Sequence, residues 1–195
     1  MSYKFCSIIF YSFHIFERNY HELKSTIQGY KNLIASDDFI SNNENYMKLH
    51  IYGGRELSRL IHNYAAAWFS LVDHTRVIQR KLKESEEEEI RKFAIEYQNK
   101  LNESLKDSFE NSFVKDLRNY VQHKAVPVPT LHWTMIRNLS NSDTPLMDTD
   151  CSFEFNTKQI QDFDWSNLSK DYIKNNVSVP FEKIIDRHFD MMMNA

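Results

Sequence analysis

The chain has 195 residues, of which 14% are aromatic, and it contains only three glycines and four prolines. This size and composition fit one domain, or one domain with an appended subdomain, and exclude both a disordered chain and a turn-rich all-β fold. The formal net charge of −3 gives no overall basic character of the kind that marks many nucleic-acid-binding domains. The charge is uneven, however. Residues 47–83 carry seven Lys and Arg against two acids, and residues 84–112 carry nine acids against four bases.

The first predicted helix covers residues 13–36, where apolar side chains recur at steps of three and four residues. The apolar stretch at 5–16 precedes it. That stretch is too short to cross a bilayer, so we expect a buried first element rather than a membrane contact. We expect no secretory signal, because the apolar stretch lacks a small-residue cleavage site, and Cys6 and Cys151 have no metal-ligand spacing. We therefore expect free thiols in a reducing cytoplasm.

Three more helices follow in chain order. A long apolar stripe predicts a second helix over residues 46–83, which Gly53-Gly54 divides or kinks because glycine is a weak helix former. A third is predicted over 84–112, with Ser85 and the acids after it at the start, where they favour the helix dipole. A fourth, shorter helix runs to about Lys124.

The pattern changes after Pro129. Loose alternation over 131–139 and 152–155 predicts a small hairpin, and residues 165–175 and 180–192 look helical. The expected fold is therefore mainly α: an up-and-down bundle of four to five helices over residues 1–129. A small C-terminal α+β extension over residues 130–195 packs on it.

Residues 113–129 carry the strongest functional signal. They place Arg118 and His123 near the end of the fourth helix, which Pro127 and Pro129 then stop. Arginine is always charged and can clamp two phosphate oxygens, and histidine can carry a proton at neutral pH. Residues five apart on an α-helix diverge by about 140°. The two side chains can therefore meet one phosphate only if the helix unwinds near its end, or if a partner chain completes the site.

The segment Arg118–His123 resembles the arginine–polar–x3–histidine signature of the HEPN superfamily, small helical bundles common in prokaryotic defence and toxin systems. Leu117 before the motif, Pro127 after it and the run Val72–Arg76 late in the second helix extend the resemblance, which covers roughly residues 46–129.

The resemblance implies a metal-independent RNA endonuclease, with no cofactor, in which the RNA 2′-hydroxyl attacks the adjacent phosphate and leaves a 2′,3′-cyclic phosphate. Arg118 would clamp the phosphate, His123 would move the proton, and Asn119 would assist. The resemblance also implies a homodimer with a composite active site, a role in toxicity or phage defence, and an antitoxin or regulatory partner. Toxin members paired with a nucleotidyltransferase carry a tyrosine two residues after the histidine. This chain has Ala125 there, so we do not expect that partner.

Weaker candidates surround the motif. Lys124 and Arg76 are candidates for RNA contact, and Asp73 is a candidate for orienting a catalytic group. Two of them have a simpler interpretation: Asp73-His74 as a helix-surface hydrogen bond, and Arg76 as a partner of the acid-rich third helix. The motif as a whole also has a non-catalytic interpretation, because HEPN bundles serve as interaction or nucleotide-binding modules as well.

Overall fold

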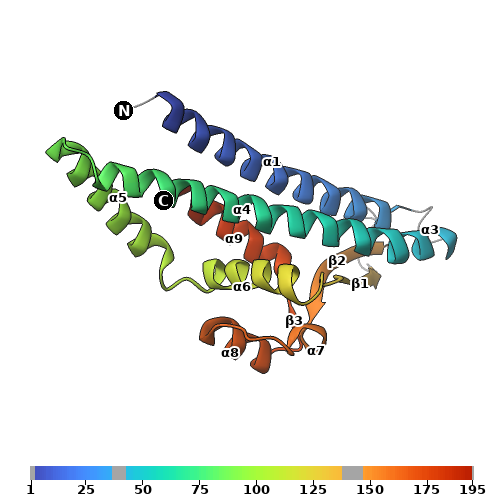
Figure 1. The fold of residues 1–195 in the computed structure, drawn as a ribbon. Coiled ribbons are helices and arrows are strands. Elements are labelled where there is room, and N and C mark those ends of the chain that lie inside the picture. Colours follow the sequence, from blue (N-terminus) through green and yellow to red (C-terminus); the bar gives the residue numbers. More distant parts are fainter. Residues whose placement is uncertain (1–2, 37–42, 138–146, 195) are drawn as a thin grey trace.

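The computed structural model describes residues 3–36, 43–137 and 147–194. Two long helices, α1 (Tyr3–Ile34) and α4 (Gly54–Lys83), lie side by side and run in opposite directions (Figure 1). Two shorter helices, α6 (Phe109–His123) and α9 (Phe181–Asn194), complete the bundle. The predicted mainly helical bundle is confirmed.

One continuous core joins the four helices of the bundle. Phe16, Tyr64, Phe113 and Ile185, one from each helix, are fully buried within it. The stripe predicted for the second helix forms much of this core, because apolar residues three and four apart share one face of a helix. Helix α9, from the expected C-terminal extension, contributes side chains to this same core.

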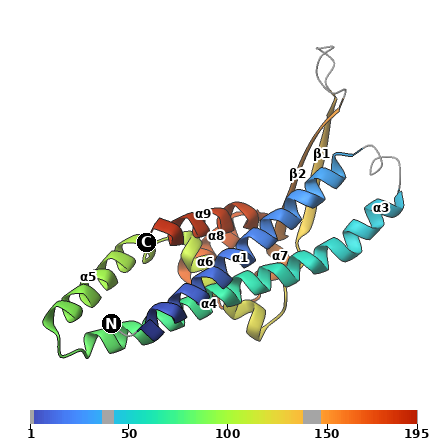
Figure 2. The same ribbon diagram turned by 90° about the horizontal axis from the view of Figure 1, so that it is seen from above.

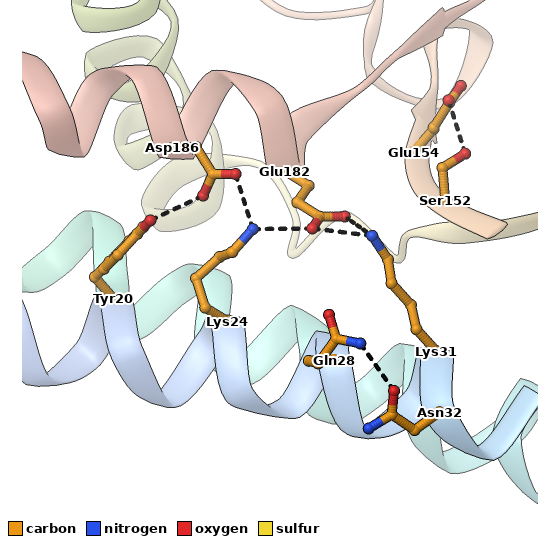
Figure 3. A network of polar contacts seen from close by, with 9 residues as sticks. All are labelled: Tyr20, Lys24, Gln28, Lys31, Asn32, Ser152, Glu154, Glu182 and Asp186. Atoms are coloured by element: carbon orange, nitrogen blue, oxygen red, sulfur yellow. Dashed lines mark hydrogen bonds and ion pairs between the residues drawn. The ribbon is translucent and has the colours of Figure 1, made fainter. Parts of the chain in front are cut away.

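A polar network fastens α9 to α1 (Figure 3). The ammonium of Lys24 lies 2.9 Å from Glu182 and 2.8 Å from Asp186, and Lys31 lies 2.9 Å from the other oxygen of Glu182. The Tyr20 hydroxyl donates to Asp186 at 3.0 Å. Charged pairs this close and partly shielded from water hold the two helices in register.

The glycine pair marks a break in the predicted second helix. A short helix α3 (Asn43–Lys48) leads into a π-helical turn, η1 (Leu49–Gly53), and α4 begins at Gly54. A Cβ at Gly53 would lie 2.8 Å from a methyl carbon of Leu49, so a side chain there would require the Leu49 side chain to move.

The third and fourth helices meet at a different point from the predicted one. Helix α5 (Glu88–Leu105) begins after Ser85 and ends seven residues before 112. Ser108 then starts α6 as its N-cap, because its hydroxyl accepts the backbone N–H of Asn111 at 3.1 Å. Helix α5 leans away from the bundle (Figure 1), and Ala94 is its one buried residue.

The C-terminal part contains the predicted hairpin. Strands β1 (Thr130–Arg137) and β2 (Met147–Asn156) pair in antiparallel fashion with Leu131 opposite Phe153, and the distal part of the hairpin extends away from the helices (Figure 2). The predicted end of the first strand, Leu139, lies outside the described residues. A two-residue strand, β3 (Ser178–Val179), joins β2 and was not predicted. Two short helices, α7 (Thr157–Ile160) and α8 (Asn167–Asn175), lie between β2 and β3.

The apolar N-terminal stretch belongs to α1 and is not a separate element. Ser12 and Phe16 are buried, but Phe10, Tyr11 and Ile15 are more than half exposed. The expectation of a buried element therefore holds for one face of this helix only. Within the described ranges, no helix combines the length and apolar character needed to cross a membrane.

Candidate functional site

The end of α6 is fixed by the proline that follows it. The Lys124 backbone N–H still donates to the carbonyl of Tyr120 at 2.9 Å, so the helix stays regular through His123. In a longer helix the ring of Pro127 would clash with the His123 carbonyl four residues earlier, and α6 ends there. Pro127 and Pro129 are buried, while Val126 and Val128 between them are about half exposed.

The segment after α6 packs against the start of α4. The Ser58 hydroxyl lies 2.8 Å from the Pro127 carbonyl oxygen. At Gly54 a Cβ would lie 3.0 Å from a methyl carbon of Val128, so the absence of a side chain allows this close approach. The carboxyl end of α6 is thus held between the core and the first turn of α4.

Arg118 lies on the flank of α6 that faces α4. Its guanidinium carbon is 3.7 Å from the centroid of the Phe69 ring, an arrangement in which the ring face attracts the cation. One terminal nitrogen donates to the Asn119 side-chain oxygen at 3.1 Å. The Nε–H is buried and has no acceptor in the described part of the chain. The structure therefore brings Arg118 and Asn119 together, and it adds Phe69 as a support.

The nearest carboxylate in sequence to Arg118 is engaged elsewhere. One oxygen of Asp116 accepts the backbone N–H of Ser166 at 3.0 Å, the Ser166 hydroxyl at 2.6 Å and the Ser169 hydroxyl at 2.7 Å. Asp116 thereby caps the first turn of α8, where a negative charge is favourable. Its carboxylate is committed to holding α8 against α6.

His123 is exposed, and the structure gives its ring no polar partner among residues 3–36, 43–137 and 147–194. Lys124, the next residue, pairs with Asp162 in the loop before α8 at 3.1 Å. Because α6 is regular from Arg118 to His123, the two side chains point about 140° apart. Within one chain, Arg118 faces α4 and His123 does not share that environment.

The remaining predicted residues lie on α4. Arg76 pairs with Asp73 of its own helix at 3.5 Å, and both side chains are about half exposed or more. The neighbouring His74 lies on another flank of α4, where its Nδ1 is 2.6 Å from the hydroxyl of Ser12 on α1. No described contact joins Asp73 to Arg118 or His123.

Sequence reasoning missed Phe69 and the role of Asp116. Phe69 follows Trp68 of the predicted buried stripe, and no spacing rule connects it with a residue on α6. Ser166 carried a weak signal, since it lies at the start of the predicted helix and serine is a common N-cap. The contact of Ser166 and Ser169 with Asp116 on α6 could not be predicted, because no local sequence pattern connects the two segments.

Within the described ranges, no three His, Cys, Asp or Glu side chains cluster so as to hold a metal ion. No protein-family model matches the chain, no curated protein matches it, and no solved structure matches it. The resemblance of residues 46–129 to HEPN proteins therefore stays a prediction that rests on this chain's own residues.

Proposed function

We propose that the chain is an RNA endonuclease of the HEPN type that acts as a homodimer. One observation carries the proposal: Arg118 is a half-buried guanidinium with no carboxylate partner among the described residues, and it lies five residues before the exposed imidazole of His123. A cation held on an aromatic ring without a protein acid beside it suits a phosphate, which accepts two parallel N–H bonds from arginine.

The reaction assigned to these groups is an internal transfer. Neutral His123 takes the proton of a ribose 2′-hydroxyl while that oxygen attacks the adjacent phosphorus. The bond from phosphorus to the 5′-oxygen breaks, and the leaving oxygen takes up a proton, so that one product ends in a 2′,3′-cyclic phosphate and the other in a 5′-hydroxyl. Arg118, oriented by Asn119, stabilises the charge that develops on the phosphate oxygens. DNA lacks the attacking hydroxyl and is not cut.

Two chains are needed to assemble this site. Arg118 and His123 diverge on a regular helix, so one chain does not direct both at the same phosphate. In a two-fold dimer, a residue of one chain faces a different residue of its partner, and the contact occurs twice. We therefore propose that Arg118 of one copy and His123 of the other form each active site.

The test is cleavage of single-stranded RNA by the purified protein in EDTA. Wild-type protein should release fragments with 2′,3′-cyclic phosphate ends, and the His123→Ala and Arg118→Ala variants should each be inactive. A 1:1 mixture of the two variants, exchanged into mixed dimers, should recover about a quarter of wild-type activity. Statistical exchange makes half of the dimers mixed, and each of these has one intact site.

Two results contradict the proposal. RNA cleavage by His123→Ala at the wild-type rate removes the catalytic assignment. No recovery from a mixture shown by mass to contain mixed dimers removes the composite site, because residues acting within one chain cannot be complemented in this way.

The resemblance places the activity in toxicity or phage defence, under an antitoxin or regulatory partner. Induced expression of the wild type should then slow bacterial growth, and expression of His123→Ala at equal level should not. Equal growth with the two proteins, despite cleavage in the test tube, would contradict the toxin role and leave the nuclease intact.

A second candidate is a non-catalytic interaction module. Exposed apolar side chains on α1, including Phe10 and Tyr11, favour it, because a run of exposed apolar residues marks many protein contacts. This candidate predicts a stable dimer whose mass is unchanged by Arg118→Ala and His123→Ala, with no RNA cleavage by any of the three proteins.

A further inference from the structure

A cleft of about 480 Å³ opens between α4, α5 and α6, with α1 and α9 at its far side. It exists because α5 leans away from the bundle and buries only Ala94. Its volume is in the range of protein sites for small organic groups. None of the catalytic residues proposed above lines it.

The walls of the cleft combine aromatic rings with side-chain amides. Phe69 and Tyr97 are half-buried rings on opposite helices, α4 and α5. On α5 the Gln98 amide nitrogen donates to the Asn102 side-chain oxygen at 3.1 Å. This pairing leaves the side-chain oxygen of Gln98 as an acceptor and the side-chain amide nitrogen of Asn102 as a donor, the two kinds of group that the edge of a nucleobase requires.

The charge of the cleft is of one sign. Its lining includes Lys106, Lys115 and Arg76, the last of which pairs with Asp73 outside the cleft at 3.5 Å, and no aspartate or glutamate lines it, although the chain as a whole is acidic. A basic surface without acids attracts an anion. An uncharged apolar ligand would use neither these cations nor the amides.

The cleft adjoins the proposed phosphate clamp. Phe69 lines the cleft and also lies beneath the Arg118 guanidinium, 3.7 Å from its central carbon. Lys115, which lines the cleft, precedes Arg118 by three residues on α6, so the two lie on neighbouring turns.

We infer that the cleft receives an unpaired base of the RNA strand whose phosphate Arg118 holds. The inference rests on the proposed ribonuclease function and adds a substrate feature to it. The base lies against the rings of Phe69 and Tyr97, the amides of Gln98 and Asn102 contact its edge, and Lys106 and Lys115 contact neighbouring phosphates. The enzyme therefore selects single-stranded RNA, because a base inside a duplex cannot enter the cleft.

The test measures binding separately from cleavage. The probe is a fluorescein-labelled single-stranded 2′-O-methyl RNA, which cannot be cut by this reaction, and its affinity is read by fluorescence anisotropy in EDTA. Wild-type protein should bind the single strand more tightly than the corresponding duplex. Tyr97→Ala should weaken binding at least about fivefold through lost stacking, and Tyr97→Phe, which keeps the ring, should bind like wild type.

Matched controls separate the cleft from the general surface. Tyr11→Ala removes an exposed ring of α1 that does not line the cleft, and it should leave affinity unchanged. Lys106→Ala should weaken binding more than Lys100→Ala, since Lys106 at the end of α5 lines the cleft and Lys100 within α5 does not. Circular dichroism melting of each variant establishes that it is folded.

The outcomes distinguish this inference from the nuclease itself. Equal affinity of Tyr97→Ala and wild type, or equal affinity for single strand and duplex, overturns the base-binding cleft even if the protein cuts RNA. Binding that depends on Tyr97 together with no cleavage overturns the nuclease and leaves the cleft as an RNA-binding site.

Discussion

The phenol oxygen of Tyr64 on α4 lies 2.7 Å from Nδ1 of His188 on α9, and this hydrogen bond joins two helices inside the core. Both residues are fully buried, with the ring of Phe16 packed edge-on against His188. The other ring nitrogen of His188 has no partner in the described chain. Burial lowers the pKa of His188 to about 3, because the charged form would lose its hydration. The folded protein therefore holds this histidine neutral.

The first prediction is acid sensitivity that depends on His188. In the unfolded chain a histidine binds a proton below about pH 6.5, but in the folded protein His188 does not until about pH 3. Between these values the unfolded state binds more protons, so the free energy of unfolding falls as the pH falls, by up to about 1.4 kcal/mol per pH unit from this group. Urea unfolding midpoints between pH 7 and 4 measure the slope. His188→Phe should flatten it, and an unchanged slope would contradict the assignment.

The second prediction concerns Glu182, which accepts from Lys24 and Lys31 between α1 and α9. Burial alone would raise the pKa of Glu182, but the two hydrogen-bonded ammonium groups outweigh it and lower the pKa. A lowered carboxylate pKa stabilises the fold above the usual glutamate range, and this contribution is lost as the pH falls through the folded value. Glu182→Gln at pH 7 should reduce the free energy of unfolding by about 1 kcal/mol.

The control for Glu182 is an exposed pair. Glu44 lies 2.8 Å from Lys48 on the same short helix, and both side chains are more than half exposed. Glu44→Gln should leave the unfolding midpoint unchanged, because water screens such a pair. Equal effects of the two substitutions would show that the network between α1 and α9 contributes nothing beyond surface charge.

The helices could be predicted from the sequence because their apolar residues recur at helical spacing within a short segment. The stripe through Leu57, Ile61, Tyr64 and Trp68 predicted a buried face, and these residues are in the core. The sequence did not predict which helices α9 contacts. An apolar helix face does not specify its neighbours, and the packing of α9 against α1, α4 and α6 is seen only in the folded structure. Strand β3 was missed for a related reason: two residues hold no alternation to detect.

Some features of the candidate site could likewise be predicted from local sequence, and others could not. The divergence of Arg118 and His123 follows from helix geometry alone, and the prolines predicted an end of the helix at about Lys124, where α6 ends at His123. The environment of Arg118 could not be read from sequence, because Phe69 and the serines that engage Asp116 come from distant segments. Sequence patterns thus identified the charged residues of α6, but packing between helices determines which side chains contact Arg118 and Asp116.

The third prediction is that Asp116 holds α8 in place. Its carboxylate accepts three hydrogen bonds from Ser166 and Ser169 at the start of that helix. Asp116→Asn keeps the shape but replaces a charged acceptor by a neutral one, which should cost about 1–2 kcal/mol of stability. Hydrogen exchange should become faster in α8, while the amides of α1 keep their protection. Asp171→Asn on the exposed side of α8 is the control, and faster exchange in that variant would contradict a specific role for Asp116.

The fourth prediction tests the support of Arg118 and depends on the proposed nuclease. Phe69→Leu keeps an apolar side chain on α4 but removes the ring 3.7 Å from the guanidinium. A cation on an aromatic face is worth about 0.5–2 kcal/mol, so kcat/KM for RNA cleavage should fall about two- to thirtyfold. Arg118→Lys should lose more, because an ammonium lacks the planar pair of donors. Phe10→Leu, on the exposed face of α1, should cut RNA at the wild-type rate. If Phe69→Leu is as active as Phe10→Leu, the ring does not position the clamp, and Arg118 must be held by its bond to Asn119 alone.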